Sequence, residues 1–516
     1  MSITVEIEDD GAVDYERAIN QDANILERLK YLPARNELYN SLWTKRKTIC
    51  SLIRHQLGLD HRDICNVASP REWIQGSFNV CIPVEVQSHH LHQKYILRCC
   101  LPHKLAETSY PGTMDEKLRC EVGAYAWMQE SCPDIRVPYL FGFGFSDDTH
   151  FTHEEYRPWY FRLARTVQRC LCALLRFPVP SRYTTNSMTH CLPTAYMLLE
   201  HIGPDTGQML SITWDKRRSE PQYRERLFRG LARVILSLAR IPQPRIGSLR
   251  FNNNCSVTLT NRPLAHQMVM LENEGIPRTM GTTDTYPSAE LYVTDMLTFY
   301  DNCLLSNPNA VFDDEDCREK MAVKTLLRAL SHRFIRRETR NGPFILQLTD
   351  LHASNVFVDD EWNLVCLVDL EWICALPSEM LAVPCWLTGH GVDELEGELL
   401  EEFEEMRLEF MRFFEEEEQE LVSRHSLSLA NIMDETWTSK GVWFWHCIKS
   451  LHAMTSLARA HICPQFSTRL TSVAEILSKF WCVDSHRMVE KKVTDLQRYE
   501  EDEGDLRHCF DRDNAN

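Results

Sequence analysis

One short segment, residues 346–372, constrains the fold and the function of this chain more than any other part of it. Two apolar runs flank the turn-forming residues 359–363, which is the pattern of a short β-hairpin. Facing Cα atoms at the feet of an antiparallel hairpin lie about 5 Å apart. We therefore expect Asn355, at one foot, to lie beside Asp369, at the other.

This pairing matters because an amide oxygen and a carboxylate placed side by side can share one hard cation, such as Mg²⁺. Asp350 lies five residues before Asn355, on the way into the hairpin, and is near enough to reach a hydroxyl group beside the metal. Phosphoryl transfer needs this set, with one Asp to orient the acceptor and an Asn and a second Asp to hold Mg²⁺. The spacing is that of protein-kinase catalytic and metal loops.

Simpler interpretations of the same residues stay open. Asp350 and Asn355 are also typical turn or cap residues. Glu371 could contact a second Mg²⁺ or cap the next helix. His352 could join Asp350 as a metal ligand, but no second histidine at a suitable spacing supports that.

The region upstream predicts a small antiparallel sheet with one helix. Alternating residues in 72–102 predict a hairpin, and apolar residues at helical spacing predict a helix over 114–131. Strand-like runs follow at 139–145 and 195–199. The order is β-β-α-β-β.

This sheet carries candidate phosphate-binding residues. Gly76 and Ser77 come just before the first strand, where backbone N–H groups could cover phosphates. Arg98, on the second strand, could bind the α- and β-phosphates, and Glu121 on the helix could pair with it. The alternative for Arg98 and Glu121 is an ordinary surface ion pair.

The last strand of the sheet leads into a candidate hinge. Glu200 and Ile202 lie at its end, where a hinge between two lobes would offer backbone groups to adenine. From residue 204 onward the pattern is mainly helical. Two lobes are therefore expected, a β-rich one followed by a helical one.

Two segments have unusual charge. An insertion over about 150–192 interleaves arginines with apolar residues, which predicts either a basic helix that covers apolar surface or a contact to an anion or substrate. The stretch 393–422 is strongly acidic, with apolar residues at helical spacing, and predicts an amphipathic helix with a solvated acidic face.

The chain ends look different from its middle. Residues 1–12 read as a disordered acidic tail, and 14–57 as amphipathic helices packed on the main domain, with a membrane-surface helix as the alternative. Residues 488–516 read as a charged tail. The expected division is 1–64 for the N-terminal tail and helices, 65–203 for the β-rich lobe, 204–483 for the helical lobe and 484–516 for the C-terminal tail.

Charge and composition limit the partners. A net charge of −18 over 516 residues argues against a nucleic-acid binder, which needs a basic footprint. No apolar run reaches the ~18 residues of a membrane span, so no membrane partner is expected. Twenty cysteines without a Cys-x-x-Cys pair, and an acidic rather than basic beginning without a targeting signal, favour free thiols and a cytoplasmic location.

Taken together, these residues resemble the aminoglycoside phosphotransferase/choline kinase group, in particular a fungal member. The resemblance covers about residues 65 to 480 and implies a protein-kinase-like α+β fold, with a small antiparallel β N-lobe and a mainly helical C-lobe. The matching stretches are 76–79, 95–98, 246–249, 259–264, 342–344, 348–355 and 368–372.

The resemblance implies an ATP-dependent kinase of the small-molecule type. Asp350 would be the catalytic base, Asn355 and Asp369 would bind Mg²⁺, and Arg98 and Glu121 would form the nucleotide-binding ion pair. The sequence departs from the family pattern at Leu348, where a bracing His is usual, and at Arg98, where Lys is usual.

We therefore expect an ATP- and Mg²⁺-dependent phosphotransferase that acts on a hydroxyl group of a small molecule, with the acidic surface favouring an amine-bearing acceptor. The alternative is a catalytically weak or inactive kinase-fold protein that serves as a binding module or scaffold. A protein kinase is disfavoured, because no Asp-Phe-Gly or Ala-Pro-Glu landmark follows Asp369.

Overall fold

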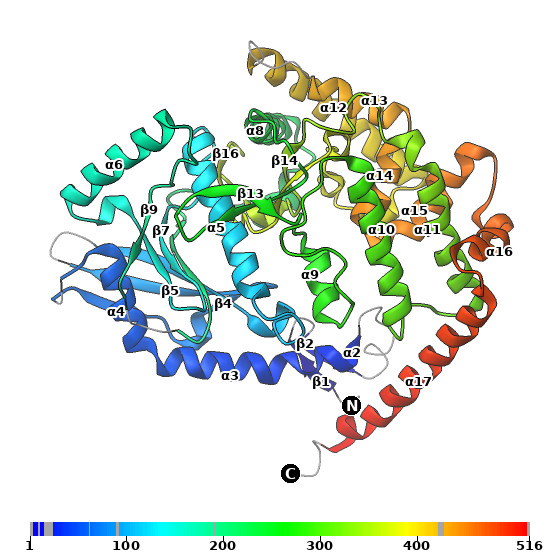
Figure 1. Cartoon of the computed structure of the whole chain (residues 1–516), viewed down its shortest axis with the longest axis horizontal. Helices are drawn as coiled ribbons and strands as arrows, with labels where there is room; N and C mark the ends of the chain where they lie inside the picture. The colour runs from blue at the N-terminus through cyan, green and yellow to red at the C-terminus, as the bar shows by residue number, and fades with distance from the viewer. Residues whose placement is uncertain are drawn as a thin grey trace.

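The computed structural model describes residues 4–8, 11–14, 24–60, 62–88, 92–188, 192–421 and 428–512. A β-rich lobe and a larger helical lobe stand side by side, with the helix α5 (Thr113–Ser131) between them (Figure 1). This is the two-lobed α+β arrangement of the protein-kinase-like fold. None of the helices in the described ranges is both long enough and apolar enough to cross a membrane.

The N-lobe is built on an antiparallel sheet of eight strands. Its central strands β5 and β6 form the predicted hairpin, with Val80 facing Cys99 and Val84 facing Tyr95. The predicted four-strand unit is therefore confirmed but incomplete. The strands, in spatial order, are β3 (Ile64–Val67), β5 (Asn79–Gln87), β6 (His92–Cys100), β10 (Tyr196–Glu200), β7 (Leu140–Gly144), β8 (His150–His153) and β9 (Tyr183–Asn186), with β4 (Ile74–Gln75) paired to β5.

The helix α5 packs against both lobes. Gly123 lies so close to β12 (Gly247–Phe251) of the C-lobe that an added Cβ would be 3.1 Å from the Phe251 nitrogen. About two helical turns earlier, the Glu116 carboxylate accepts from Asn261 at 3.0 Å and from Arg262 at 2.8 Å. All three of these polar side chains are buried. These contacts fix α5 to the C-lobe.

The C-lobe is mainly helical and holds two small sheets. One has the order β13-β12-β17-β14 and the other β11-β15-β16. Their remaining strands are β11 (Gln208–Met209), β13 (Val257–Asn261), β14 (Ile345–Leu348), β15 (Val356–Val358), β16 (Leu364–Leu367) and β17 (Ile373–Leu376). The C-lobe helices are α7 (Leu210–Arg217), α8 (Pro221–Ala239), α9 (His266–Asn273), α10 (Ala289–Ser306), α11 (Asp314–Phe334), α12 (Gly397–Leu421), α13 (Leu429–Thr438), α14 (Gly441–Lys449), α15 (Leu451–Leu457) and α16 (Leu470–Trp481).

The predicted hairpin over 356–368 is confirmed as β15 and β16. Val356 faces Leu367, and the turn contains Trp362, whose side chain is buried and stacks on Trp214 with ring centroids 5.5 Å apart. The Trp362 indole also donates to Thr213 at 3.1 Å. The residues 359–363 form the turn as expected, and Trp362 anchors this turn to α7.

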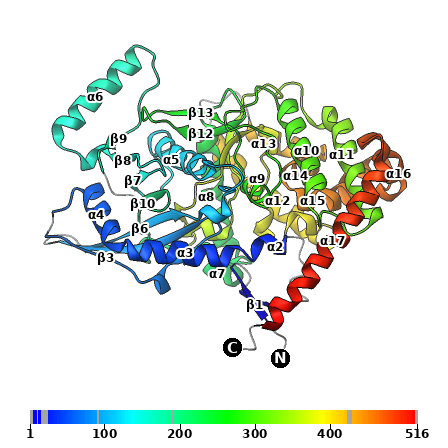
Figure 2. The ribbon, with the colours of Figure 1, turned by 60° about the horizontal axis from the view of Figure 1, so that its bottom comes forward.

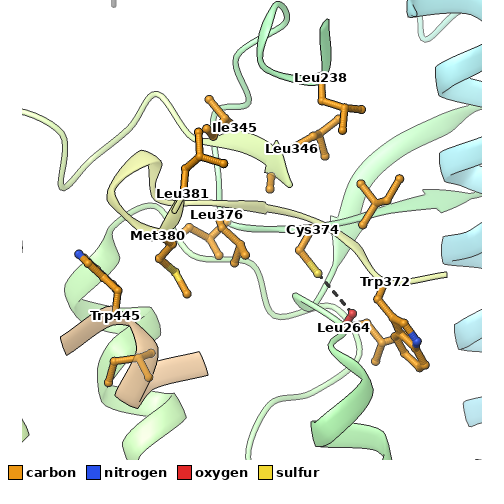
Figure 3. Packing of buried hydrophobic residues seen from close by; sticks show 14 of the residues in the cluster. Leu238, Leu264, Ile345, Leu346, Trp372, Cys374, Leu376, Met380, Leu381 and Trp445 are labelled. Carbon is orange, nitrogen blue, oxygen red and sulfur yellow. Dashed lines mark hydrogen bonds between the residues drawn. The ribbon is translucent and has the colours of Figure 1, made fainter. Parts of the chain in front are cut away.

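The largest core cluster surrounds the β14–β17 pair. Figure 3 shows Ile345, Leu346 and Leu376 from these strands among Met380, Leu381 and Trp445. The Cys374 thiol donates to the Leu264 carbonyl at 3.3 Å. All cysteines whose side chains the structure describes are free, as expected from their spacing.

The helix α12 has the predicted amphipathic character. Its apolar side chains Phe403, Phe410 and Phe413 are buried. The acidic face is not simply solvated, however. Glu417 is buried and accepts from Arg233 on α8 at 2.6 Å, because α8 packs alongside α12.

Both terminal segments are more ordered than the sequence suggested. The described part of the N-terminus contains a short hairpin, β1 (Thr4–Ile7) with β2 (Gly11–Asp14), followed by α2 (Ile25–Arg28), α3 (Tyr31–Thr44) and α4 (Arg46–Leu57). The C-terminal segment is a long helix, α17 (Ser485–Arg512), which runs back toward the N-terminal hairpin (Figure 2). The Tyr499 hydroxyl accepts from the Ile25 backbone nitrogen at 2.9 Å. Contacts of this kind join distant parts of the chain and leave no local signal in the sequence.

The basic insertion forms the helix α6 (Trp159–Leu174), but the expectation that it covers apolar surface is wrong. No residue of α6 is buried. Arg165 and Arg169 contact the rest of the N-lobe, and the apolar side of the helix faces solvent. Helical periodicity shows that a helix has two unlike faces, but it does not show which face meets the rest of the protein.

Candidate active site

The predicted site residues meet at a cleft of about 540 Å³ between the lobes. This volume falls in the usual range for small-ligand sites. One end of the cleft is apolar, with Leu199, Ile202 and Phe357 among its lining, and the other end is charged. The predicted residues that line it are Gly76, Ser77, Arg98, Glu200, Ile202, Asp350, Asn355 and Asp369.

The hairpin feet hold Asn355 in a defined orientation. The Val368 nitrogen donates to the Asn355 carbonyl at 3.0 Å, so that Asn355 lies beside the residue preceding Asp369. The Asn355 side-chain nitrogen donates to the Asp350 carbonyl at 3.0 Å. Because the nitrogen is engaged there, the amide oxygen is the atom that remains to bind a cation. His352 caps the turn by accepting from the Ser354 nitrogen at 3.3 Å.

Arg98 is the centre of the charged end. Its guanidinium lies 3.1 Å from Glu121, 2.6 Å from Asp369 and 3.0 Å from Glu371. Glu121 does not line the cleft but is fully buried behind it, where it pairs with Arg98. The pair is therefore interior, and the alternative of a surface ion pair is wrong.

A second cation, Lys117 on α5, was missed by the sequence analysis. Its amino group is fully buried, donates to Asn79 at 2.7 Å, lies 3.2 Å from Glu121 and forms an ion pair with Glu371. Burial lowers the pKa of Lys117, but the charges of Glu121 and Glu371 outweigh it and raise the pKa above its usual value. The i, i+4 spacing of Lys117 and Glu121 was a usable signal for this pair.

Glu371 belongs to the same network. The Asn79 amide donates to its carboxylate at 2.7 Å. Burial would raise the pKa of Glu371, but Lys117 and Arg98 hold it below its usual value. Glu371 is therefore a charged member of the cluster, and in the described ranges its carboxylate caps no helix.

Asp369 has a different environment. Burial raises its pKa to about 6, with Glu371 and Glu121 adding to the increase and Arg98 opposing it. Its backbone has a positive φ of 61°, a conformation that non-glycine residues adopt at a cost. The surrounding contacts, above all that with Arg98, hold it there.

The donor set fits a divalent cation. Carboxylate oxygens of Glu121, Asp369 and Glu371 lie within 4.8 Å of one another. Oxygen ligands of this kind, together with the Asn355 amide oxygen, suit Mg²⁺. The three carboxylates face two cations, Arg98 and Lys117, so the cluster keeps a formal negative charge that favours a further cation.

The segment before Asp350 is braced without the usual histidine. Leu348 pairs with Ile373 in the β14–β17 ladder. The Thr349 hydroxyl donates to the Trp372 carbonyl at 2.7 Å. Trp372 in turn packs edge-on against Phe78, with ring centroids 5.0 Å apart. This chain of contacts connects the Gly76 loop to the segment that carries Asp350.

The hinge end is held by Glu200. Its carboxylate accepts from Arg136 at 2.9 Å and from the Tyr139 nitrogen at 3.2 Å. The Glu200 carboxylate therefore forms hydrogen bonds within the hinge region. Ile202 contributes apolar surface to the cleft.

A histidine on α9, His266, also lines the cleft and was missed by the sequence analysis. Burial lowers its pKa, although Asp350 and Glu371 oppose the effect. His266 is therefore expected to be neutral near pH 7, with ring nitrogens that can donate or accept a hydrogen bond near Asp350. No pattern in the sequence distinguished it.

No family model and no curated protein matches the sequence. Among solved structures, a macrolide 2'-phosphotransferase type I is 11% identical and matches over 81% of this chain and 96% of its own, with a TM-score of 0.35. A spectinomycin phosphotransferase, solved with ADP and spectinomycin, is 9% identical, covers 84% and 98%, and has a TM-score of 0.31. A protein assigned as a fructosamine-3-kinase from Haemophilus somnus 129PT is 11% identical, covers 80% and 99%, and has a TM-score of 0.32.

The TM-scores of these superpositions are low. The fold assignment therefore rests on the chain's own topology: the antiparallel N-lobe sheet, the helix α5 behind it and the hairpin of the helical lobe. The fungal origin suggested by the resemblance stays an expectation. In its two-lobed α+β fold, the chain is similar to small-molecule kinases of the aminoglycoside phosphotransferase type.

Proposed function

We propose that the protein is an ATP- and Mg²⁺-dependent phosphotransferase that acts on a hydroxyl group of a small molecule. The observation that carries the proposal is the convergence of Asp350, Asn355, Asp369 and Arg98 on one interlobe cleft. The three solved structures are small-molecule phosphotransferases or kinases by name, which agrees with it.

Each side chain has a distinct role in the proposal. Asp350 accepts the proton of the acceptor hydroxyl as that oxygen attacks the γ-phosphate. Asn355 and Asp369 would hold Mg²⁺, which supplies positive charge against the phosphates when it is bound. Arg98 and the backbone of Gly76 and Ser77 steady the phosphates.

The remaining cleft residues position the nucleotide. Ile202 and its apolar neighbours take the base, and Glu200 keeps the hinge in place through Arg136. Glu121 and Lys117 act from behind the cleft by fixing Arg98 and Glu371. Among acceptors, amine-bearing alcohols are the first class to test, because the chain is strongly acidic.

A panel of small alcohols, with amines and sugars represented, tests the proposal through ATP consumption. The wild type should consume ATP with at least one acceptor, and Asp350→Asn should not. Asp360→Asn is the matched control, because Asp360 lies in the turn of the same hairpin, away from the cleft lining. Equal consumption by wild type and Asp350→Asn would contradict the proposed base.

A second candidate function is a kinase-fold binding module with little or no activity. The contact between Arg98 and Asp369 favours it, because a guanidinium occupies the carboxylate that Mg²⁺ would need. A binding module would be stabilised by nucleotide equally with and without Mg²⁺, whereas the enzyme's stabilisation would require the metal. Thermal unfolding with ATP, in Mg²⁺ or in EDTA, separates the two.

A further inference from the structure

The helix α6 is amphipathic, but its apolar side points away from the protein. Trp159, Leu163, Val167, Leu171 and Leu174 recur at helical spacing on one face. Their exposed fractions run from 52% for Val167 and Leu171 to 79% for Leu174. An apolar stripe of this kind is ordinarily the buried side of a surface helix, so here something outside the chain is expected to cover it.

Hydrogen bonds from the opposite, polar face of α6 explain why its apolar side points away from the protein. Arg169 makes a two-pronged pair with Glu130 of α5, at 3.0 and 2.8 Å. Arg165 donates to the carbonyls of Ser181 and Tyr183 at 3.0 and 2.9 Å. These bonds attach α6 to the N-lobe through its polar side and hold the apolar side outward.

The position and charge of α6 favour a lipid surface. Both ribbon views place α6 at the outer edge of the N-lobe, on the far side from α16 (Figures 1 and 2). Residues 156–199 contain six arginines and no acidic residue, although the whole chain has a net charge of −18. Arg162 directly precedes Leu163 of the apolar stripe, Arg176 follows Leu174 by two residues, and both are exposed, so they could reach anionic headgroups.

The aromatic residues point to the same occupant. Trp159 and Tyr160 are consecutive and exposed at the start of α6, and aromatic side chains with a polar edge prefer the headgroup level of a bilayer. A second copy of the chain is less suitable, because an isologous pairing along α6 would set arginines beside arginines. The stripe is also a ridge one helix wide, and no cleft described above includes it.

We propose that α6 binds the surface of a bilayer that contains anionic lipid, lying in the plane of the headgroups with its apolar stripe in the membrane. The expectation of no membrane partner rested on the lack of a spanning segment, which a helix lying on the surface does not need. A helix of 16 residues that inserts only its apolar side fits this mode of binding.

Vesicle flotation of the full chain tests the proposal. Vesicles of phosphatidylcholine and phosphatidylserine, at a ratio of about two to one, should carry the protein, and phosphatidylcholine alone should carry much less. Leu171→Gln with Leu174→Gln should lower binding by about tenfold or more. Phe480→Gln removes an equally exposed apolar side chain from α16 and should leave binding unchanged.

Cys170 gives a second readout, because it is exposed on the apolar side of α6. Anionic vesicles should slow its alkylation by a membrane-impermeant maleimide, measured as the difference from Cys170→Ser. Unchanged ATP-induced stabilisation in the leucine variants would show that they are folded.

Two outcomes would overturn the proposal. One is equal flotation of the wild type and the folded double leucine variant. The other is a wild-type dimer in analytical ultracentrifugation that the double variant abolishes, with no vesicle binding by either, which would assign the stripe to a second copy of the chain.

Discussion

The guanidinium of Arg98 lies 2.6 Å from the carboxylate of Asp369, across the interface between the two lobes. The first belongs to the N-lobe sheet and the second follows the hairpin of the C-lobe. A cation that binds Asp369 must therefore displace the guanidinium of Arg98 from this carboxylate. The phosphates of a nucleotide could attract the same guanidinium and so leave Asp369 to the cation. We therefore expect nucleotide and metal to bind cooperatively.

This cooperativity gives the first prediction. ATP at 100 times its dissociation constant adds about 2.7 kcal/mol to the free energy of unfolding, and most of this should require Mg²⁺. Asp369→Asn should lose the Mg²⁺-dependent part, as measured by thermal unfolding with ATP in Mg²⁺ and in EDTA. Asp360→Asn should behave as the wild type. A Mg²⁺ effect that survives Asp369→Asn would contradict metal binding at Asp369.

Asp350 should affect the reaction and not the binding of nucleotide. Loss of a general base typically lowers the rate by about 10²- to 10⁴-fold. Asp350→Asn should therefore lower kcat by that order while ATP-induced stabilisation stays within error of the wild type. A loss of ATP stabilisation in Asp350→Asn would mean that Asp350 is structural.

The buried lysine Lys117 should matter for stability. Lys117→Met leaves Glu121 and Glu371 with one cation fewer in the interior, and breaking a buried ion pair from one side costs about 3–5 kcal/mol. Urea unfolding should show a loss of this order. The double variant Lys117→Met with Glu371→Gln should be less destabilised than the sum of the single variants, because it removes the uncompensated charge. Additive losses would contradict the pairing.

Lys324 on α11 should make stability depend on pH. Burial lowers its pKa to about 8, below the usual 10.5, with Asp301 opposing. Between these two pH values the unfolded chain binds more protons, so the wild type gains stability as the pH rises from about 8 to 10.5. Lys324→Met should remove the free-energy cost of burying a charged lysine. The free energy of unfolding should therefore rise by roughly 3 kcal/mol at pH 7, and this gain should shrink toward pH 10.

Chemical denaturation of the wild type and Lys324→Met across this pH range checks the prediction. Lys320→Met is the matched control, because Lys320 pairs with Asp316 at 2.8 Å and is less buried. It should not stabilise the protein at pH 7. A gain for Lys324→Met that is equal at pH 7 and pH 10 would mean that the cause is packing rather than charge.

The candidate site was largely predictable where its signal is local. Asn355 and Asp369 meet because a hairpin of a few residues brings its feet together, and both the hairpin and its turn are visible in the sequence. The i, i+4 spacing of Lys117 and Glu121 could have suggested their pairing, but the burial of Lys117 and the position of His266 at the cleft were not predictable, because both depend on tertiary packing. Periodicity identified the two faces of α6 but could not orient them, since Glu130, which fixes the orientation, lies far away in the chain.

The attachment of α5 to the C-lobe has a further consequence. In protein kinases, activity is often controlled by moving the helix whose glutamate pairs with the strand cation. Here Gly123 lies against β12, and Glu116 is held by the buried Arg262. Swinging α5 outward would break that pair and expose charged groups, so we expect Glu121 to stay paired with Arg98 when a ligand binds. A switch in this protein would have to act through the sheet or the cleft entrance, not through the helix.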